Sequence, residues 1–379
     1  MKTLFDYTNE QIKYKNFSEE VRLTKETKAG ASYSKYTCTN KNGVTFHEVP
    51  GLVGLIGAAV MGYVNGDRAR PVIIGPATKP TVNASSFGNL WYGNKALISG
   101  GYDNATFYGN IDTVSIPTLS DATNFGNLIA TILKAAGCSN NVRGVMAGGT
   151  NSTPASVNTI QYNIFATTGN SVSFGSLAAI RTAMAACSNG LRGVFHSVRP
   201  GGLKNMEYVT IATTGNSSQF GDTTSDSSDR AGASNGSRGI FAGGIAGGVV
   251  ATIDYFSIAS ASDSVLFGNL QIARSGLAGV GNSTYCLFAG GGTPAPIYYS
   301  AIERIATATL SNSSTFGNLS TTRVGTVGAH NETRAIFSGG YNGVNISSIE
   351  YVQFSTTGSS QNFGNLSQAK YHSAGTSGD

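Results

Sequence analysis

Histidine and serine are the residues most often used for metal binding and nucleophilic chemistry, and neither has a catalytic spacing here. The four histidines, at positions 47, 196, 330 and 372, show no H-x-x-x-H or H-E-x-x-H pattern of a zinc site. The sequence also has no G-x-S-x-G elbow and no Walker loop. Gly-rich stretches at 243–248 and 290–292 precede no helix signal, so they are interpreted as turns. We therefore expect turn or surface histidines, no metal and no cofactor.

Carboxylates are sparse, and a glycoside hydrolase needs two at a defined separation. Asp103, Asp112 and Asp121 lie within one segment, but all three suit turns and strand ends. We expect no enzymatic activity. A polysaccharide-degrading enzyme is kept as an alternative.

The four cysteines have neither C-x-x-C nor metal-ligand spacing, and they are Cys38, Cys138, Cys187 and Cys286. Two of them occupy the same place in consecutive repeats, AAGCSNN and AACSNG, where a small buried residue is needed. We expect free, structural thiols.

Binding chemistry is better represented than catalytic chemistry. Several variable segments offer tyrosine beside asparagine or aspartate, and aromatic faces with amide neighbours suit the C–H patches and hydroxyls of sugar rings. The candidate ligand-binding residues are Trp91, Tyr92, Tyr102, Asp103, Asn104, Tyr298, Tyr299, Tyr341 and Asn342. The alternative is that each is an ordinary loop residue covering a sheet edge.

These segments must be positioned by a repeated scaffold. The word FGNL stands at 87–90, 125–128, 267–270, 316–319 and 363–366, with looser copies at 174 and 220. Gly-Gly pairs end short apolar runs at 97–101, 145–149, 240–244, 287–291 and 336–340. A period near 47 residues predicts a propeller or solenoid.

Each unit contains four short segments rich in β-branched or aromatic residues and bounded by Gly, Asn or Ser, which is typical of antiparallel strands. The Gly-Gly pair is expected to supply positive φ or a close backbone approach. The Phe of FGNL is expected to wedge between blades, holding them by apolar contact rather than by charges. Arginines near the unit starts, Arg181, Arg230, Arg274 and Arg323, are expected to reach turn carbonyls.

The order Arg, apolar strand, Gly-Gly, Tyr strand and aromatic-x-x-Leu resembles the kelch repeat over residues 95–379, with Phe in place of Trp. The resemblance implies an all-β propeller and says little about ligand. The last segment, LSQAKYHSAGTSGD, lacks a Gly-Gly partner, and KALISGG at 95–101 lacks a preceding strand. Pairing these two would close a ring of six blades. Seven blades is the alternative.

Residues 1–86 do not follow the repeat and carry much of the charge, so domains are expected at 1–86 and 87–379. The stretch VMGYVNGDRARPVIIGP at 60–76 resembles the end of the small OB-like barrels of bacteriophage tail-hub and spike proteins. That resemblance implies a small β-barrel-like domain docking to other virion proteins, with homo-oligomerisation through it. An unrelated small β-domain or a decorated first blade is the alternative.

Composition excludes several partners. No run of Lys or Arg forms a nucleic-acid stripe, and the longest apolar stretch, 51–64, is too short to span a bilayer. The N-terminus lacks an apolar secretory segment. Together with phage-like Ser/Thr/Asn/Gly repeats, this favours a virion protein of the tail, baseplate or neck, assembled in the host cytoplasm and released by lysis. It would display the propeller to a host-surface glycan, a receptor or a neighbouring protein. A cellular kelch-type adaptor is the alternative.

Overall fold

The structure of the protein is a computed structural model that describes residues 11–14, 21–27, 34–39, 45–50, 90–153, 155–197, 204–294 and 296–379. The chain divides into two compact units, Met1–Asn83 and Ala84–Asp379. In the first unit, an antiparallel sheet follows chain order: β1 (Gln11–Tyr14), β2 (Val21–Thr27), β3 (Ser34–Thr39) and β4 (Thr45–Pro50). The predicted barrel motif at 60–76 and the predicted boundary at 86/87 lie outside the described residues.

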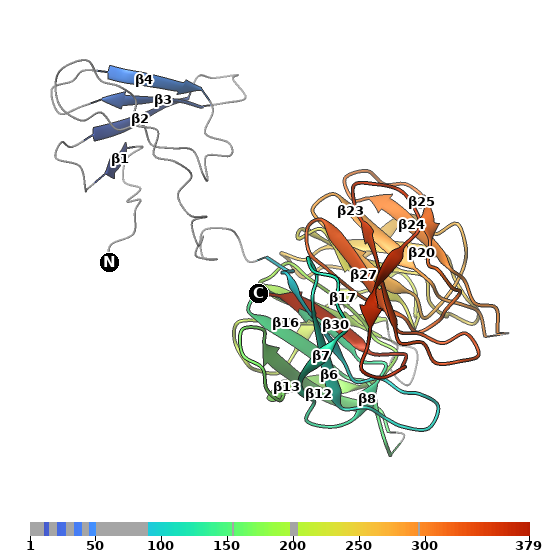
Figure 1. Cartoon of the computed structure of the whole chain (residues 1–379). Helices are drawn as coiled ribbons and strands as arrows, with labels where there is room; N and C mark the ends of the chain where they lie inside the picture. Colours follow the sequence, from blue (N-terminus) through green and yellow to red (C-terminus); the bar gives the residue numbers. More distant parts are fainter. Residues whose placement is uncertain are drawn as a thin grey trace. The chain divides into compact units, whose positions relative to one another are not determined.

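The second unit is a six-bladed β-propeller, as predicted (Figure 1). Blade 1 orders β30 (Ala374–Gly378), β5 (Lys95–Ser99), β6 (Asn110–Ser115) and β7 (Thr123–Asn127). Blade 2 has β9 (Ala136–Ser139), β10 (Arg143–Ala147), β12 (Val157–Ile164) and β13 (Val172–Arg181), with a small extra sheet of β8 (Ile132–Leu133) and β11 (Thr150–Asn151). Blade 3 has β14 (Ala185–Ser188), β15 (Arg192–His196), β16 (Asn205–Thr210) and β17 (Ser218–Asp222).

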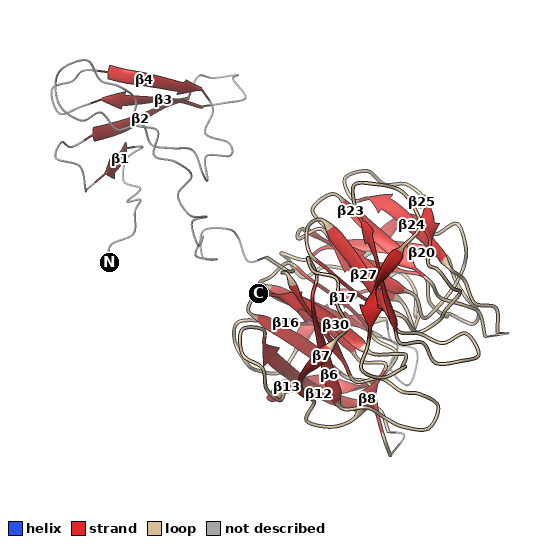
Figure 2. Cartoon of the chain, viewed as in Figure 1, coloured by secondary structure: helices blue, strands red, loops and turns tan. Residues whose placement is uncertain are grey.

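The remaining blades repeat the same order. Blade 4 has β18 (Ala231–Ser234), β19 (Arg238–Ala242), β20 (Thr252–Ser257) and β21 (Val265–Asn269). Blade 5 has β22 (Ala278–Gly281), β23 (Tyr285–Ala289), β24 (Ala301–Ala306) and β25 (Ser314–Asn318). Blade 6 has β26 (Val327–His330), β27 (Arg334–Ser338), β28 (Ser348–Gln353) and β29 (Gln361–Asn365). Every described regular element is a strand (Figure 2), and none of the described residues forms a helix that could cross a membrane.

The ring closes between the two ends of the second unit. The C-terminal strand β30 pairs antiparallel with β5, with Ala374 opposite Ser99 and Gly378 opposite Lys95. In Figure 1 this red strand lies among the blue-green strands of blade 1. Since β30 supplies the inner strand that blade 1 would otherwise lack, closure removes a free sheet edge. The predicted closure is confirmed.

The apolar core is divided into six clusters, and each cluster joins two neighbouring blades. Phe125 of blade 1, for example, packs with Met146 and Phe165 of blade 2. The FGNL-type phenylalanines are each only 3% exposed, and they are Phe125, Phe174, Phe220, Phe267, Phe316 and Phe363. The predicted wedge role of this residue is confirmed. Burial of each ring is worth roughly 1.5–3 kcal/mol.

The glycine of FGNL is required by the neighbouring blade. A Cβ on Gly126 would meet the carbonyl of Gly169, and a Cβ on Gly317 would meet the carbonyl of Gly358. In both cases the carbonyl belongs to the turn between the third and fourth strands of the next blade. The FGNL sequence therefore recurs because the same turn of the next blade packs against this glycine in each repeat.

Charges contribute more to the blades than the sequence suggested. Four buried arginine pairs, Arg181–Glu207, Arg230–Asp254, Arg274–Glu303 and Arg323–Glu350, and the pair Lys370–Asp112 recur in five blades. The prediction named apolar contact rather than charges, and it left out these buried ion pairs. Asp112 was also misplaced, because it is fully buried within β6 rather than in a turn or at a strand end.

The arginines also reach turn carbonyls, as predicted. Arg181 Nη1 donates to the carbonyls of Ser197 (2.7 Å) and Asn205 (3.0 Å). The carboxylates of these pairs also accept hydrogen bonds from the blade-linking loop that precedes their blade. Glu350 Oε2, for example, accepts from Ser320 N–H at 2.8 Å. Burial raises the pKa of Glu350, but hydrogen bonds from Ser320 and Ser360 and the charge of Arg323 outweigh burial, so the pKa lies below its usual range.

Candidate functional site

The propeller has two faces with different chemistry. Because the strands of each blade are antiparallel and follow chain order, turns alternate between the faces. The face that carries the Gly-Gly turns and the blade-linking loops is called the Gly-Gly face. The opposite face carries turns capped by Asn140, Asn189, Asn235, Asn282 and Asn331 and is called the Asn-turn face.

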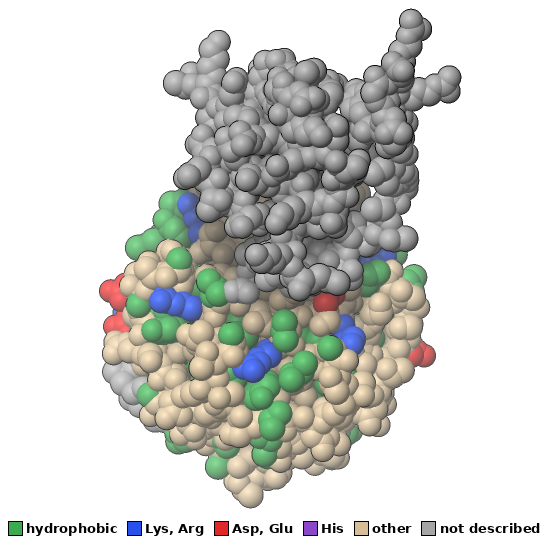
Figure 3. All heavy atoms as spheres, turned by 90° about the vertical axis from the view of Figure 1, so that its left-hand side faces the viewer, with side chains coloured by type: hydrophobic (Ala, Val, Ile, Leu, Met, Phe, Trp, Pro, Cys, Tyr) green, Lys and Arg blue, Asp and Glu red, His purple; other side chains and the backbone are tan. Residues whose placement is uncertain are grey.

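All five Gly-Gly pairs have positive φ at both residues, as at Gly339 (63°) and Gly340 (123°), which confirms the predicted conformation. These turns release the variable loops between the second and third strands. On the face that Figure 3 draws, most side chains of the described residues are uncharged, and Lys, Arg, Asp and Glu appear as isolated groups. No charged field therefore covers the described part of that face.

Six residues in left-handed conformation surround the channel at the Gly-Gly face, one from each blade-linking loop. They are Lys134, Ala183, Asp229, Gly276, Gly325 and His372, with φ between 51° and 66°. Their backbones are joined around the axis: His372 N–H donates to Gly325 O (2.8 Å), and Lys134 N–H donates to His372 O (2.9 Å). We call these six residues the channel mouth. These hydrogen bonds fix the backbone positions from which the side chains extend.

Three titratable side chains come from the channel mouth. Lys134 Nζ lies 3.3 Å from each carboxylate oxygen of Asp229. The mouth residue between them is Ala183, whose side chain is only a methyl group. The side chains of Lys134 and Asp229 are 30% and 16% exposed. Behind them lies a channel cavity of about 110 Å³. That volume suits a few waters, since each takes about 30 Å³ of liquid volume.

His372 is uncharged at neutral pH. Burial, followed by the charge of Lys134, lowers its pKa to about 4, and Asp229 only partly opposes this. The mouth therefore carries one positive charge, one negative charge and one neutral imidazole.

A series of aromatic rings runs beside the mouth over blades 5, 6 and 1. Ring centroids are 6.0 Å apart for Tyr298–Tyr341, 5.4 Å for Tyr341–Tyr371, 5.9 Å for Tyr371–Tyr102 and 4.8 Å for Tyr102–Phe107. We call these five residues the aromatic arc. All five residues are partly exposed.

Hydrogen bonds between loops hold the arc in place. Tyr371 Oη donates to Asn104 Oδ1 (2.8 Å), and Asn104 Nδ2 donates to Asn345 Oδ1 (3.2 Å). Asn345 Nδ2 in turn donates to the carbonyl of Asp103 (2.6 Å). The loops of blades 6 and 1 are thereby tied together, which reduces the ordering cost of ligand binding.

A glycine explains how the arc reaches the mouth. A Cβ on Gly325 would lie 3.0 Å from Tyr371 Cδ2 and from His372 Nδ1, and its φ is 66°. Only glycine therefore lets the two rings lean over this position. Tyr371 and His372 also contact each other, with centroids 4.9 Å apart. The arc and the mouth form one continuous site.

The carboxylate beside the arc is ionised. Asp103 accepts from Tyr108 Oη (2.6 Å) and from the N–H groups of Thr106 (2.6 Å) and Ala105 (3.0 Å). The hydrogen bond from Tyr108, followed by that from Thr106, holds the Asp103 pKa below its usual value. Asp103 can therefore accept hydrogen bonds but cannot donate them at neutral pH.

The predicted ligand-binding residues fall into two groups. Tyr102, Asp103, Asn104, Tyr298 and Tyr341 are brought together on the Gly-Gly face. Tyr299 and Asn342 lie in the same loops and do not take part in the ring contacts that define the arc. Their N–H groups donate to Gly291 O (2.9 Å) and Val344 O (3.2 Å), respectively.

Trp91 and Tyr92 are at the other end of the channel, on the Asn-turn face. Trp91 Nε1 donates to Gly281 O (3.3 Å), and its carbonyl accepts from Ser139 Oγ (3.1 Å). A Cβ on Gly236 would overlap the Trp91 ring. Tyr92 lies 5.7 Å from the His330 ring. These two residues bridge blades 2, 4, 5 and 6 and do not join the aromatic arc.

Sequence reasoning missed Tyr371, Phe107, Asn345 and the mouth residues. The six blade-linking loops share a sequence signal for the mouth, because the left-handed residue always stands nine positions after the FGNL-type Phe. Phe363 thus leads to His372, and Tyr371 precedes it. Loop contacts such as Asn104–Asn345 join residues 241 positions apart and have no local signal.

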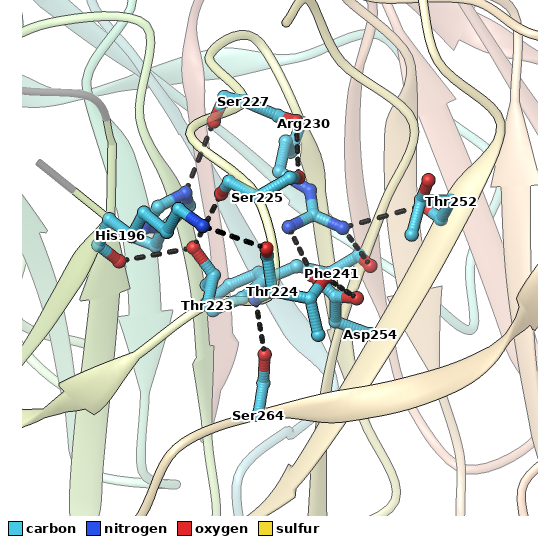
Figure 4. Close-up of polar contacts among 11 residues, drawn as sticks. His196, Thr223, Thr224, Ser225, Ser227, Arg230, Phe241, Thr252, Asp254 and Ser264 are labelled. Carbon is cyan, nitrogen blue, oxygen red and sulfur yellow. Dashed lines mark hydrogen bonds and ion pairs between the residues drawn. The ribbon is translucent and has the colours of Figure 1, made fainter. Parts of the chain in front are cut away.

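A second polar cluster lies buried between blades 3 and 4 (Figure 4). His196 is 1% exposed, so the expectation of a turn or surface histidine was wrong here. Its Nε2 lies 3.1 Å from the carbonyl of Ser227, and Arg230 Nη1 donates to Asp254 Oδ2 at 2.6 Å. Because His196 faces a carbonyl and the aspartate is occupied by arginine, this geometry differs from a serine–histidine–aspartate relay. The cluster joins the two blades.

The thiols of Cys138, Cys187 and Cys286 are free and buried, as predicted, and the Cys38 side chain lies outside the described residues. Among the described residues, no group of His, Cys, Asp and Glu is arranged to hold a metal ion. Comparison of the sequence with protein-family models and with curated proteins found no match.

Proposed function

We propose that the protein is a non-enzymatic binding protein that recognises a surface glycan through the Gly-Gly face of its propeller. The observation that carries the proposal is the aromatic arc, in which five partly exposed rings lie side by side and are fixed by hydrogen bonds between loops. Aromatic faces stack on the C–H patches of sugars, and nearby amide and carboxylate groups bond their hydroxyls.

The proposed setting is a bacteriophage virion, with the protein at the tail, baseplate or neck. Kelch-like Phe/Gly-Gly repeats, a charged fraction of 12% and Ser/Thr/Asn-rich turns support it. Residues 1–86 would dock to other virion proteins, and the propeller would contact the host surface. Exposed loops on a rigid scaffold are the usual place for such recognition.

The proposal is tested by applying the labelled full chain to an array of bacterial capsule, lipopolysaccharide and teichoic-acid glycans. Binding to a defined glycan without its degradation supports the proposal. Absence of binding to every glycan, or release of shorter products, contradicts it.

The setting is tested separately by immuno-electron microscopy of phage particles from the source sample, with an antibody to residues 95–379. Label at the tail tip or baseplate supports host recognition, and label at the neck supports a structural role. No label on any virion would favour the cellular adaptor.

A further inference from the structure

The cavity behind the channel mouth limits how a sugar can bind. Its volume of about 110 Å³ is well below the 300–1,000 Å³ of typical small-molecule pockets. A pyranose ring therefore has to lie over the mouth, against the aromatic arc, with only its hydroxyl groups directed toward the channel. Tyr371, next to His372, is where the arc meets the mouth.

The Lys134–Asp229 pair can hold such hydroxyls. A lysine ammonium has three donors and a carboxylate about four acceptor sites, so one ion pair leaves capacity on both groups. With Nζ and the two oxygens 3.3 Å apart, the pair presents a donor and an acceptor side by side. Neighbouring hydroxyls on a sugar match this arrangement, because each can donate and accept.

The charge of the site argues against an acidic sugar. The charges of Lys134 and Asp229 cancel, His372 is neutral, and the ionised Asp103 lies beside the arc. The basic residues of the blade-linking loops that adjoin the arc are buried and already paired: Arg274 with Glu303, Arg323 with Glu350 and Lys370 with Asp112. The exposed Lys204 lies on blade 3, where its Nζ donates to the carbonyl of Thr224 (3.1 Å). A sugar carboxylate would meet a net negative site.

We infer that the site binds a neutral pyranose with vicinal hydroxyls, its ring against Tyr341 and Tyr371 and its hydroxyl pair toward Lys134 and Asp229. This inference rests on the proposed glycan binding and specifies the class of sugar.

Matched ligands test the charge argument. Oligogalacturonate, oligomannuronate and oligoglucuronate are titrated into the full chain by calorimetry, each before and after reduction of its carboxylates to hydroxymethyl groups. At least one reduced, neutral oligosaccharide is expected to bind at least ten-fold more tightly than its acidic parent. Equal or tighter binding of the acidic parents overturns the inference while leaving glycan binding in place. No binding of any of the six overturns the inference, whereas glycan binding itself is decided by the array.

Variants test the hydroxyl contacts. Lys134→Met, Asp229→Asn and the double variant are each expected to weaken binding of the neutral oligosaccharide by about ten-fold or more, since hydrogen bonds to charged groups are lost. Asp263→Asn, a matched change at a carboxylate that accepts from Asp222 N–H (2.9 Å) between blades 3 and 4 and contacts neither the mouth nor the arc, should leave affinity unchanged. Unchanged affinity in the correctly folded double variant overturns the role of the pair.

Discussion

Replacing Arg323 by isoleucine should destabilise the propeller, and a second substitution should restore much of the loss. Arg323 is fully buried, and it pairs with Glu350 and donates to the carbonyl of Gly339 (3.2 Å). Removing the arginine leaves the carboxylate buried without its counter-charge. Breaking a buried pair in this way costs about 3–5 kcal/mol.

Blade 2 contains the template for the rescue. Ile132 stands two residues before the left-handed Lys134, where Arg323 stands two before Gly325, and Gln161 stands where the other blades have a carboxylate. Gln161 Oε1 accepts from Ile129 N–H at 2.9 Å, as Glu350 accepts from Ser320. Arg323→Ile combined with Glu350→Gln therefore replaces the ion pair of blade 6 with the uncharged Ile/Gln combination that blade 2 already has.

The assay is thermal and urea unfolding of the wild type, both single variants and the double variant. Each single variant is expected to lose about 3–5 kcal/mol, or roughly 5–8 °C in Tm, and the double variant only about 1–2 kcal/mol. The coupling between the two changes would then be strongly favourable. Additive losses in the double variant would refute the view that charge pairing, rather than each side chain's packing, decides this position.

Three further outcomes are expected. Gly317→Ala should lower stability by about 1–3 kcal/mol, because its Cβ would meet the carbonyl of Gly358. Gly358→Ala should be neutral, because nothing lies within 4 Å of a Cβ placed there. Equal urea midpoints for the two variants would contradict this. Burial, followed by the charge of Arg230, depresses the His196 pKa from 6.5 to about 3, so the unfolded chain takes up a proton first and stability should fall as pH drops from about 6.5 toward 3. His196→Ala should reduce that slope between pH 7 and pH 5, and an unchanged slope would count against it. Emission from Trp91, the sole tryptophan, should not change when a glycan binds, since Trp91 lies on the Asn-turn face; quenching would place the ligand on that face.

The architecture could be predicted because short local sequence motifs mark each repeat. FGNL and Gly-Gly recur once per blade, since each marks a backbone approach or a left-handed turn that a side chain would prevent. The missing partner of KALISGG similarly predicted the closing strand, which β30 supplies. These features are local, so a single sequence reveals them.

The buried pairs and the site were harder to predict for a physical reason. Glu207 and Arg181 pair across 26 residues, and the pairing depends on how a loop folds over the blade. The arc required knowing that residues 102, 341 and 371 meet across the ring closure. Trp91 resembles a binding residue in sequence, but its ring is used to bridge blades.

The most direct test of the central claim is the affinity of the full chain for its best array glycan when two rings of the arc are removed. Tyr341→Ala with Tyr371→Ala is compared with Tyr162→Ala, a half-buried tyrosine that stacks on Arg143 instead of lying in the arc. The arc variant is expected to lose at least ten-fold in affinity, since two of the apolar faces against which a sugar ring stacks are removed. The control should keep wild-type affinity. Wild-type affinity in a folded arc variant would contradict glycan recognition by the Gly-Gly face.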